Sequence, residues 1–182
     1  MFIINGTESQ KWRKKPGWPA FLDEKILDEV EKGKTALCLA DTLSRLADIF
    51  PYKIVSRESD WLDGNWASAL NWYNPRHTVF QNLNFGKSFG FEAYEVLPHY
   101  IISDIHTEEF EAVNAGLFIG WVHLKSAYTL ELKYGKGKIL LTTFDLSNQN
   151  DPYVQTLRKN IFTYINSKNF HPTIDLKLST GE

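Results

Sequence analysis

Residues 35–40 read TALCLA, a run of strand length that follows directly after a helical pattern. A strand without polar alternation is buried on both faces, as when helices cover a parallel sheet. The preceding helix is predicted over residues 21–32 by a one-sided apolar stripe, and Gly33 is typical of the residue that closes a helix. A short apolar strand is predicted at residues 2–6. This alternation predicts a right-handed parallel crossover.

The pattern continues with a second helix, which Asp41 or Thr42 can cap and which ends before Pro51. Later in the chain, strands are predicted at residues 127–133 and 139–144, joined by a turn that contains Gly135 and Gly137. The strongest helix signal begins at Asp151–Pro152, where a capping residue precedes a proline at the first turn. Three residues of this half are expected in the core: Leu140, Ile161 and Ile165.

Together these patterns predict a three-layer α/β domain with a mainly parallel central sheet and helices on both faces. An antiparallel hairpin near Gly135–Gly137 completes the sheet. The 182 residues allow one domain of ordinary size, which we assign to residues 1–166. Residues 56–90 have no sustained period and are interpreted as an aromatic-rich insertion, and residues 167–182 as a polar tail.

Charge and cysteine usage exclude several classes of partner. The formal net charge is −2, which argues against a nucleic acid or an anionic membrane as the partner. The single cysteine excludes an internal disulfide framework and a cysteine-based zinc cage. Because no apolar run approaches about 18 residues and no secretion signal is recognisable, we expect a soluble protein and leave its compartment open.

The sequence offers no convincing catalytic or metal-binding motif. Cys38 lies in mid-strand between two leucines, where a buried structural thiol is expected rather than a nucleophile. The five histidines form no ligand pair of the H-x-x-x-H or H-x-H kind. The glycine-lysine turn at residues 134–138 precedes a strand, whereas a phosphate-binding loop opens a helix. We therefore predict no catalytic residue, no metal and no cofactor.

The aromatic insertion is the most suggestive feature. Flat rings beside amide and carboxyl groups suit sugars, whose C–H faces stack while their hydroxyl groups need polar partners. The candidate ligand-binding residues are Trp61, Asp63, Trp66, Asn71, Trp72 and Tyr73. The alternative is that these rings form the insertion's own core or an interface to another domain.

Three stretches of the chain resemble a known family. They are residues 74–83, beginning NPRHTVF; residues 115–121, AGLFIGW; and residues 134–144, YGKGKILLTTF, which Asp151–Pro152 and the final helix follow. This combination is similar to the accessory α/β domain of glycoside hydrolase family 2 proteins, the β-galactosidase-like enzymes. That domain belongs to the class I glutamine amidotransferase-like, flavodoxin-related superfamily, and ThuA-like proteins are the nearest alternative family.

The resemblance implies a non-catalytic accessory domain of a larger carbohydrate-processing protein. In such proteins the catalytic glutamates lie in a separate barrel domain, so no hydrolytic residue is carried over to this chain. The expected partners are the other domains of the parent glycoside hydrolase, with carbohydrate as a further candidate. Two alternatives stay open: a small ThuA-like or amidotransferase-like enzyme acting on a sugar or amide, and a protein-interaction module.

Overall fold

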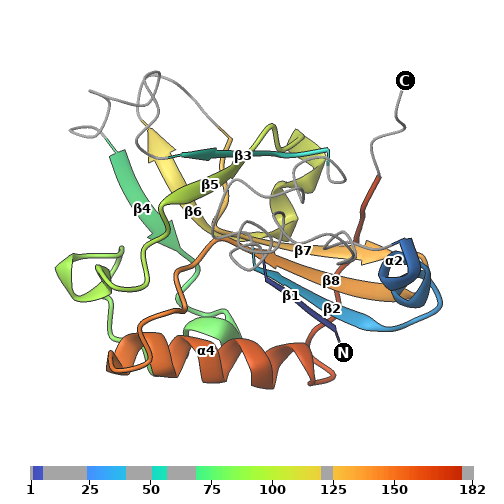
Figure 1. Ribbon diagram of the computed structural model, residues 1–182. Coiled ribbons are helices and arrows are strands. Elements are labelled where there is room, and N and C mark those ends of the chain that lie inside the picture. Colours follow the sequence, from blue (N-terminus) through green and yellow to red (C-terminus); the bar gives the residue numbers. More distant parts are fainter. Residues whose placement is uncertain (1, 6–23, 40–50, 57–68, 120–124, 178–182) are drawn as a thin grey trace, which may run out of the picture.

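The computed structural model describes residues 2–5, 24–39, 51–56, 69–119 and 125–177 (Figure 1). Its helices and strands are, in chain order, β1 (Phe2–Asn5), α2 (Glu24–Glu31), β2 (Thr35–Leu39), β3 (Lys53–Ser56), β4 (Ala69–Tyr73), η2 (Thr78–Phe80), η3 (Phe91–Ala93), β5 (Tyr100–Ser103), η4 (Thr107–Ala112), β6 (Val113–Ile119), β7 (Thr129–Tyr134), β8 (Gly137–Thr142), α4 (Pro152–Ile165) and β9 (Ile174–Asp175), where η denotes a 3-10 helix.

The main sheet has seven strands in the order β1-β2-β8-β7-β6-β4, and β9 pairs with β7 beside that path. Strands β1, β2 and β8 are parallel, whereas β8, β7, β6 and β4 are successively antiparallel. A separate antiparallel pair, β3 with β5, lies over one face of the main sheet (Figure 1). Among the described strands, antiparallel pairings therefore outnumber parallel ones.

The expected mainly parallel, flavodoxin-like sheet with a helical layer on each face is thus wrong. The apolar run of β2 is indeed buried, with Leu37 and Cys38 fully enclosed. However, burial of a strand on both faces requires only that something covers each face of the sheet. The sequence-based prediction assumed that helices cover both faces. One face is covered by α4, but the other is covered by the short α2 together with the β3–β5 pair. The predicted helix after Asp41 lies outside the described residues.

Several local predictions are confirmed. The β7–β8 hairpin turns at Gly135, whose φ of 58° is a left-handed conformation that glycine adopts without strain. Asp151 caps α4 by accepting hydrogen bonds from the amides of Tyr153 and Val154 at 2.8 and 2.9 Å. Gly33 also has a positive φ after α2, and Leu140, Ile161 and Ile165 are buried.

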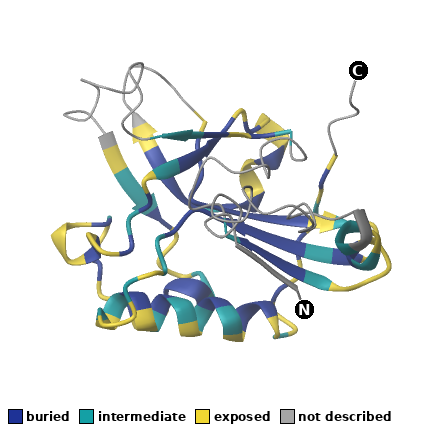
Figure 2. Ribbon diagram, in the orientation of Figure 1, coloured by how far each residue is buried: buried dark blue, intermediate teal, exposed yellow. Residues whose placement is uncertain are grey.

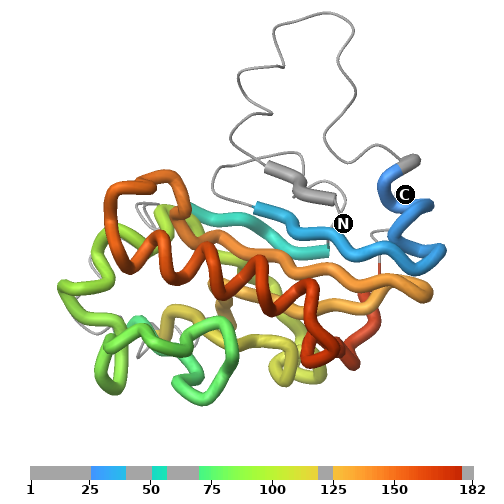
Figure 3. The backbone as a smooth tube through the Cα atoms, turned by 90° about the horizontal axis from the view of Figure 1, so that it is seen from below, coloured from blue at the N-terminus to red at the C-terminus, as the bar shows by residue number. Residues whose placement is uncertain are grey.

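The core between the sheet and α4 is largely aromatic. Its rings come from the segment 69–97 and from the strands and loops around it, in edge-on and tilted contacts with centroids about 5 to 6 Å apart. Tyr73, for example, contacts Phe89 at 4.7 Å and Phe80 at 5.2 Å. Figure 2 shows this inner side of the sheet and of α4 buried and the outer side of α4 exposed. In Figure 3, seen from below, α4 lies in front of the sheet and runs in roughly the same direction as the strands.

Candidate functional site

The predicted sugar-binding residues are partly within the described chain. Trp61, Asp63 and Trp66 lie outside the described residues, whereas Asn71, Trp72 and Tyr73 lie on β4. The Tyr73 ring is buried in the aromatic core, and its hydroxyl donates to the Gly86 carbonyl at 2.7 Å. This residue is therefore held by the fold rather than presented to a ligand.

Asn71 and Trp72 are half-buried and also have partners within the chain. The amide oxygen of Asn71 accepts a hydrogen bond from the Tyr128 hydroxyl. The Trp72 ring is stacked on Phe110 with centroids 6.5 Å apart, and its indole nitrogen lies over Gly116. Sugar contact at these positions stays a prediction, and any such contact would compete with packing that already exists.

A carboxylate cluster that the sequence analysis did not single out lies on the α4 side of the sheet. Glu131 of β7 accepts three hydrogen bonds. Its Oε1 lies 2.8 Å from His77 Nε2 and 2.9 Å from Asn114 Nδ2, and its Oε2 accepts from the Tyr164 hydroxyl at 2.9 Å. The side chains of Glu131 and His77 are only 10% and 15% exposed. One carboxylate therefore joins β7 to β6, to α4 and to the turn before η2.

The hydrogen bonds within this cluster fix its protonation pattern. The backbone amide of Val79 points at His77 Nδ1, 3.4 Å away, so that nitrogen is the acceptor and Nε2 carries the proton that faces Glu131. Burial raises the pKa of Tyr164 well above its usual range, and the neighbouring Glu131 charge adds to the effect. Each donor thus has its acceptor inside the cluster. The arrangement acts as a structural tie between β7, β6, α4 and the turn before η2.

Cys38 is fully buried in β2, as expected, and burial raises its pKa from 9.0 to about 12. The thiol ionises near pH 9 in the unfolded chain but only near pH 12 in the folded one. The folded state therefore loses stability as the pH rises from about 9 to about 12. From this group alone we expect the free energy of unfolding to fall between about pH 9 and pH 12, which amounts to about 1.4 kcal/mol in total between pH 8 and pH 10. Urea titrations at about pH 8 and about pH 10 measure it.

The matched variant is Cys38→Ala, which removes the ionisable thiol and keeps the tyrosines that also titrate at high pH. Its unfolding free energy should depend less steeply on pH than that of the wild type. Equal slopes in the two proteins would contradict a sealed thiol.

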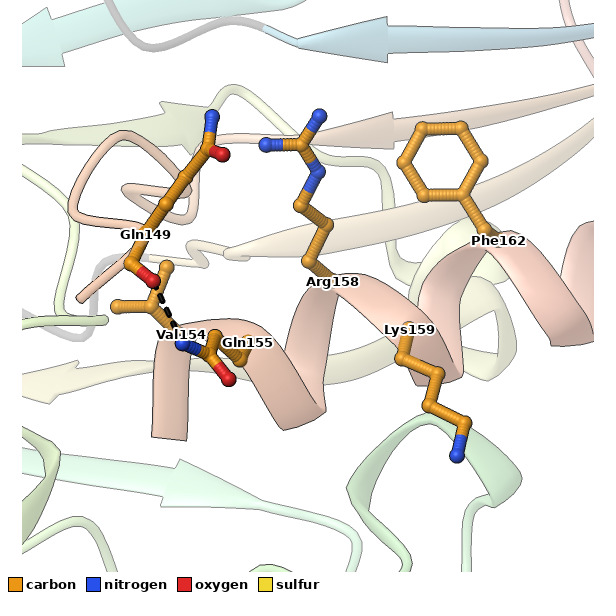
Figure 4. A pocket seen from close by; sticks show the side chains of 6 residues that line it. All are labelled: Gln149, Val154, Gln155, Arg158, Lys159 and Phe162. Carbon is orange, nitrogen blue, oxygen red and sulfur yellow. Dashed lines mark hydrogen bonds between the residues drawn. The ribbon is translucent and has the colours of Figure 1, made fainter. Parts of the chain in front are cut away.

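An open pocket of about 380 Å³ lies beside the first turns of α4. The described residues that line it are Gln149, Val154, Gln155, Arg158, Lys159 and Phe162 (Figure 4). The Gln155 side chain donates to the Gln149 carbonyl at 2.6 Å and fixes one rim. The guanidinium of Arg158 lies 5.9 Å from the Phe162 ring centroid. In Figure 4 the Arg158 and Gln149 side chains extend to the same side of the helix, whereas Lys159 points away from them.

The chemistry of this pocket is that of an anion receptor with an apolar wall. None of its described lining residues is acidic, and two are basic. A guanidinium offers a planar fork of donors that matches a carboxylate or phosphate, while Phe162 and Val154 can contact the apolar part of a ligand. The sequence signal was the spacing of residues 155, 158 and 162, which places them on one side of a helix. Among the described residues, no group of three or more His, Cys, Asp and Glu side chains could hold a metal ion.

Comparison with known proteins gives little beyond the fold. Residues 122–181 match the model of a domain of unknown function (DUF8487), which includes both Glu131 and the pocket helix. No curated protein matches the sequence. The structure is similar to that of Cytoplasmic Protein STM3548 from Salmonella typhimurium, with a TM-score of 0.50 and 15% identity over 90% of this chain and 69% of that one. This likeness concerns the fold alone. No helix among the described residues has the length and apolar character needed to cross a membrane.

Proposed function

We propose that this chain is a non-catalytic binding domain whose α4 pocket receives the anionic group of a ligand with an aromatic or aliphatic part. The observation that carries the proposal is the pocket itself, in which Arg158 stands beside an aromatic wall without an acidic neighbour among the described lining residues. A half-buried guanidinium held against a ring is positioned for a charged partner at little cost in side-chain entropy.

The polar groups that a catalyst would use support a binding role. Cys38 is sealed in the core, and Glu131 and His77 are engaged with each other and with Tyr164. This agrees with the accessory role that the family resemblance implies, although the flavodoxin-like fold that accompanied it is wrong. That the parent protein is a glycoside hydrolase, and that its other domains or carbohydrate are the partners, stay predictions of the resemblance.

The proposal is tested by titrating the full chain with phenylacetate, a small probe that combines a ring with a carboxylate. We expect NMR shifts at the Arg158 side chain and along the first turns of α4, with an affinity of about millimolar as is usual for a ligand of this size. Phenylacetamide, which has the same shape without the charge, should bind at least about tenfold more weakly because it lacks the charge-assisted pair.

Arg158→Gln should abolish the response to phenylacetate, whereas Arg76→Gln serves as the matched control because Arg76 is exposed and lies outside the pocket lining. Shifts that avoid α4, or an Arg158→Gln protein that binds like the wild type, would contradict the proposal.

A further inference from the structure

Two aromatic side chains project into solvent from the short helix η3 and the residue after it. Phe91 is 99% exposed and Tyr94 is 73% exposed. They are three residues apart, so they lie on the same side of a 3-10 turn. Water-exposed rings of this size are unusual on a surface and are typical of anchors that fill a partner's pocket. We call residues 90–95 the anchor segment.

The anchor segment is held in place rather than loosely attached. Its inner side is fixed by Ala93 and by the following Val96, both fully buried. The amide of Gly90 donates to Glu92 Oε1 at 3.2 Å, and Asn148 donates to Glu95 Oε2 at 2.7 Å. A segment whose backbone is already fixed loses little conformational entropy on binding, which favours its use as an anchor.

The charges of the anchor segment complement those of the α4 pocket. Glu92 and Glu95 are exposed beside the two rings. The pocket presents Arg158, with Phe162 as its wall. The pocket volume of about 380 Å³ is large enough for a single phenyl group. Phe91 does not fill the pocket of its own chain, because its ring is almost completely exposed.

We infer that the ligand of the α4 pocket is the anchor segment of a second copy of this chain, with Phe91 in the pocket and Glu92 facing Arg158. This inference rests on the proposed function, because it names the partner of the same pocket. It identifies the anionic group as a glutamate carboxylate and the aromatic part as a phenylalanine ring.

The positions of the two features allow the contact to be made twice. Asn148, which holds Glu95, is the neighbour of the pocket residue Gln149, so anchor segment and pocket lie at the same end of the molecule (Figures 1 and 3). A two-fold dimer can therefore be reciprocal. Four rings that each bury about 150–250 Å² give an interface below the usual size of stable complexes. The dimer is accordingly weak and concentration-dependent.

Sedimentation velocity on the full chain from about 10 µM to about 1 mM measures this self-association. We expect the weight-average sedimentation coefficient of the wild type to rise with concentration. Phe91→Ala and Arg158→Glu should each weaken the association at least about tenfold. Phe91 is almost fully exposed and Arg158 is half-buried beside Phe162, so melting temperatures should fall by a few degrees at most. Phe118→Ala and Arg76→Glu are the matched controls on exposed residues elsewhere and should associate like the wild type.

A wild type that stays monomeric throughout, or association that survives either Phe91→Ala or Arg158→Glu, would overturn the inference. Titration with phenylacetate distinguishes a failure of the dimer inference from a failure of the proposed function. If the probe binds in an Arg158-dependent manner while the chain stays monomeric, the pocket is a receptor for another partner. If the probe does not bind either, both proposals fail. Inhibition of wild-type association by phenylacetate is the expected result.

Discussion

Gly137→Ala should destabilise the protein by at least about 3 kcal/mol, since overpacking against fixed atoms is among the costliest single changes. A Cβ atom on Gly137 would lie 1.8 Å from the Val30 carbonyl oxygen and 2.4 Å from that of Lys34. Both are backbone atoms, one in the last turn of α2 and one in the turn that follows it, so no side chain can rotate away. The amide of Lys138 also donates to the Lys34 carbonyl, which ties the same segments together. Urea unfolding followed by circular dichroism measures the loss.

Gly86→Ala is the matched control for this substitution. Gly86 has a φ of 71°, but a Cβ there would meet nothing within 4 Å. Its expected cost is only the backbone strain of a left-handed residue, about 1–2 kcal/mol. If Gly137→Ala unfolds at the same urea concentration as Gly86→Ala, the close approach of β8 to α2 is not as described.

Glu131→Ala should cost about 3 kcal/mol or more, because several largely buried donors lose their shared acceptor at once. The substitution leaves His77 Nε2, the Asn114 amide and the Tyr164 hydroxyl without their shared acceptor. The Asn114 amide then loses its acceptor, while His77 Nε2 and the Tyr164 hydroxyl, 3.3 Å apart, keep only each other. Because the cluster joins α4 to the sheet, its loss should also speed hydrogen exchange in α4, which two-dimensional NMR can follow.

Glu29→Ala is the appropriate comparison, because it removes an ion pair with Lys32 whose side chains are 42% and 69% exposed. Such a pair contributes about 1 kcal/mol or less. Equal effects of the two substitutions would show that the Glu131 cluster is not the tie that we describe.

The sequence predicted α2, β2, the β7–β8 hairpin and α4, because local signals determine them, but it did not predict β3 or β4. The cap at Asp151 and the glycine turn after Tyr134 act over a few residues, and the structure contains both. The burial of Cys38 followed from an apolar run within a single strand. The direction of a strand, in contrast, is not determined by such local signals. An apolar run looks the same whether its neighbour is parallel or antiparallel, so β6 and β4 could not be oriented from their composition.

The candidate sites were harder to predict, because their members come from distant segments. An acidic residue between Leu130 and Leu132 was a visible warning that Glu131 is a buried charge. Nothing in the sequence, however, indicates that its partners are His77 and Tyr164. The pocket on α4 depends in the same way on the loop that places Gln149 beside Arg158. Contacts of this kind follow from tertiary packing, which no local period encodes.

The order of strands also has a consequence for how the chain folds. β2 pairs with β8, whose partner residues are synthesised roughly a hundred residues later, from Lys138 opposite Thr35. During translation β2 is synthesised before β8, its neighbour toward the centre of the sheet. The apolar side chains of β2 therefore become buried only after the β7–β8 hairpin has been made. Pairing over such a separation is slow, because the loop must close before any contact rewards it. The hairpin, a local unit, is therefore expected to form first and to serve as the template on which β2 docks.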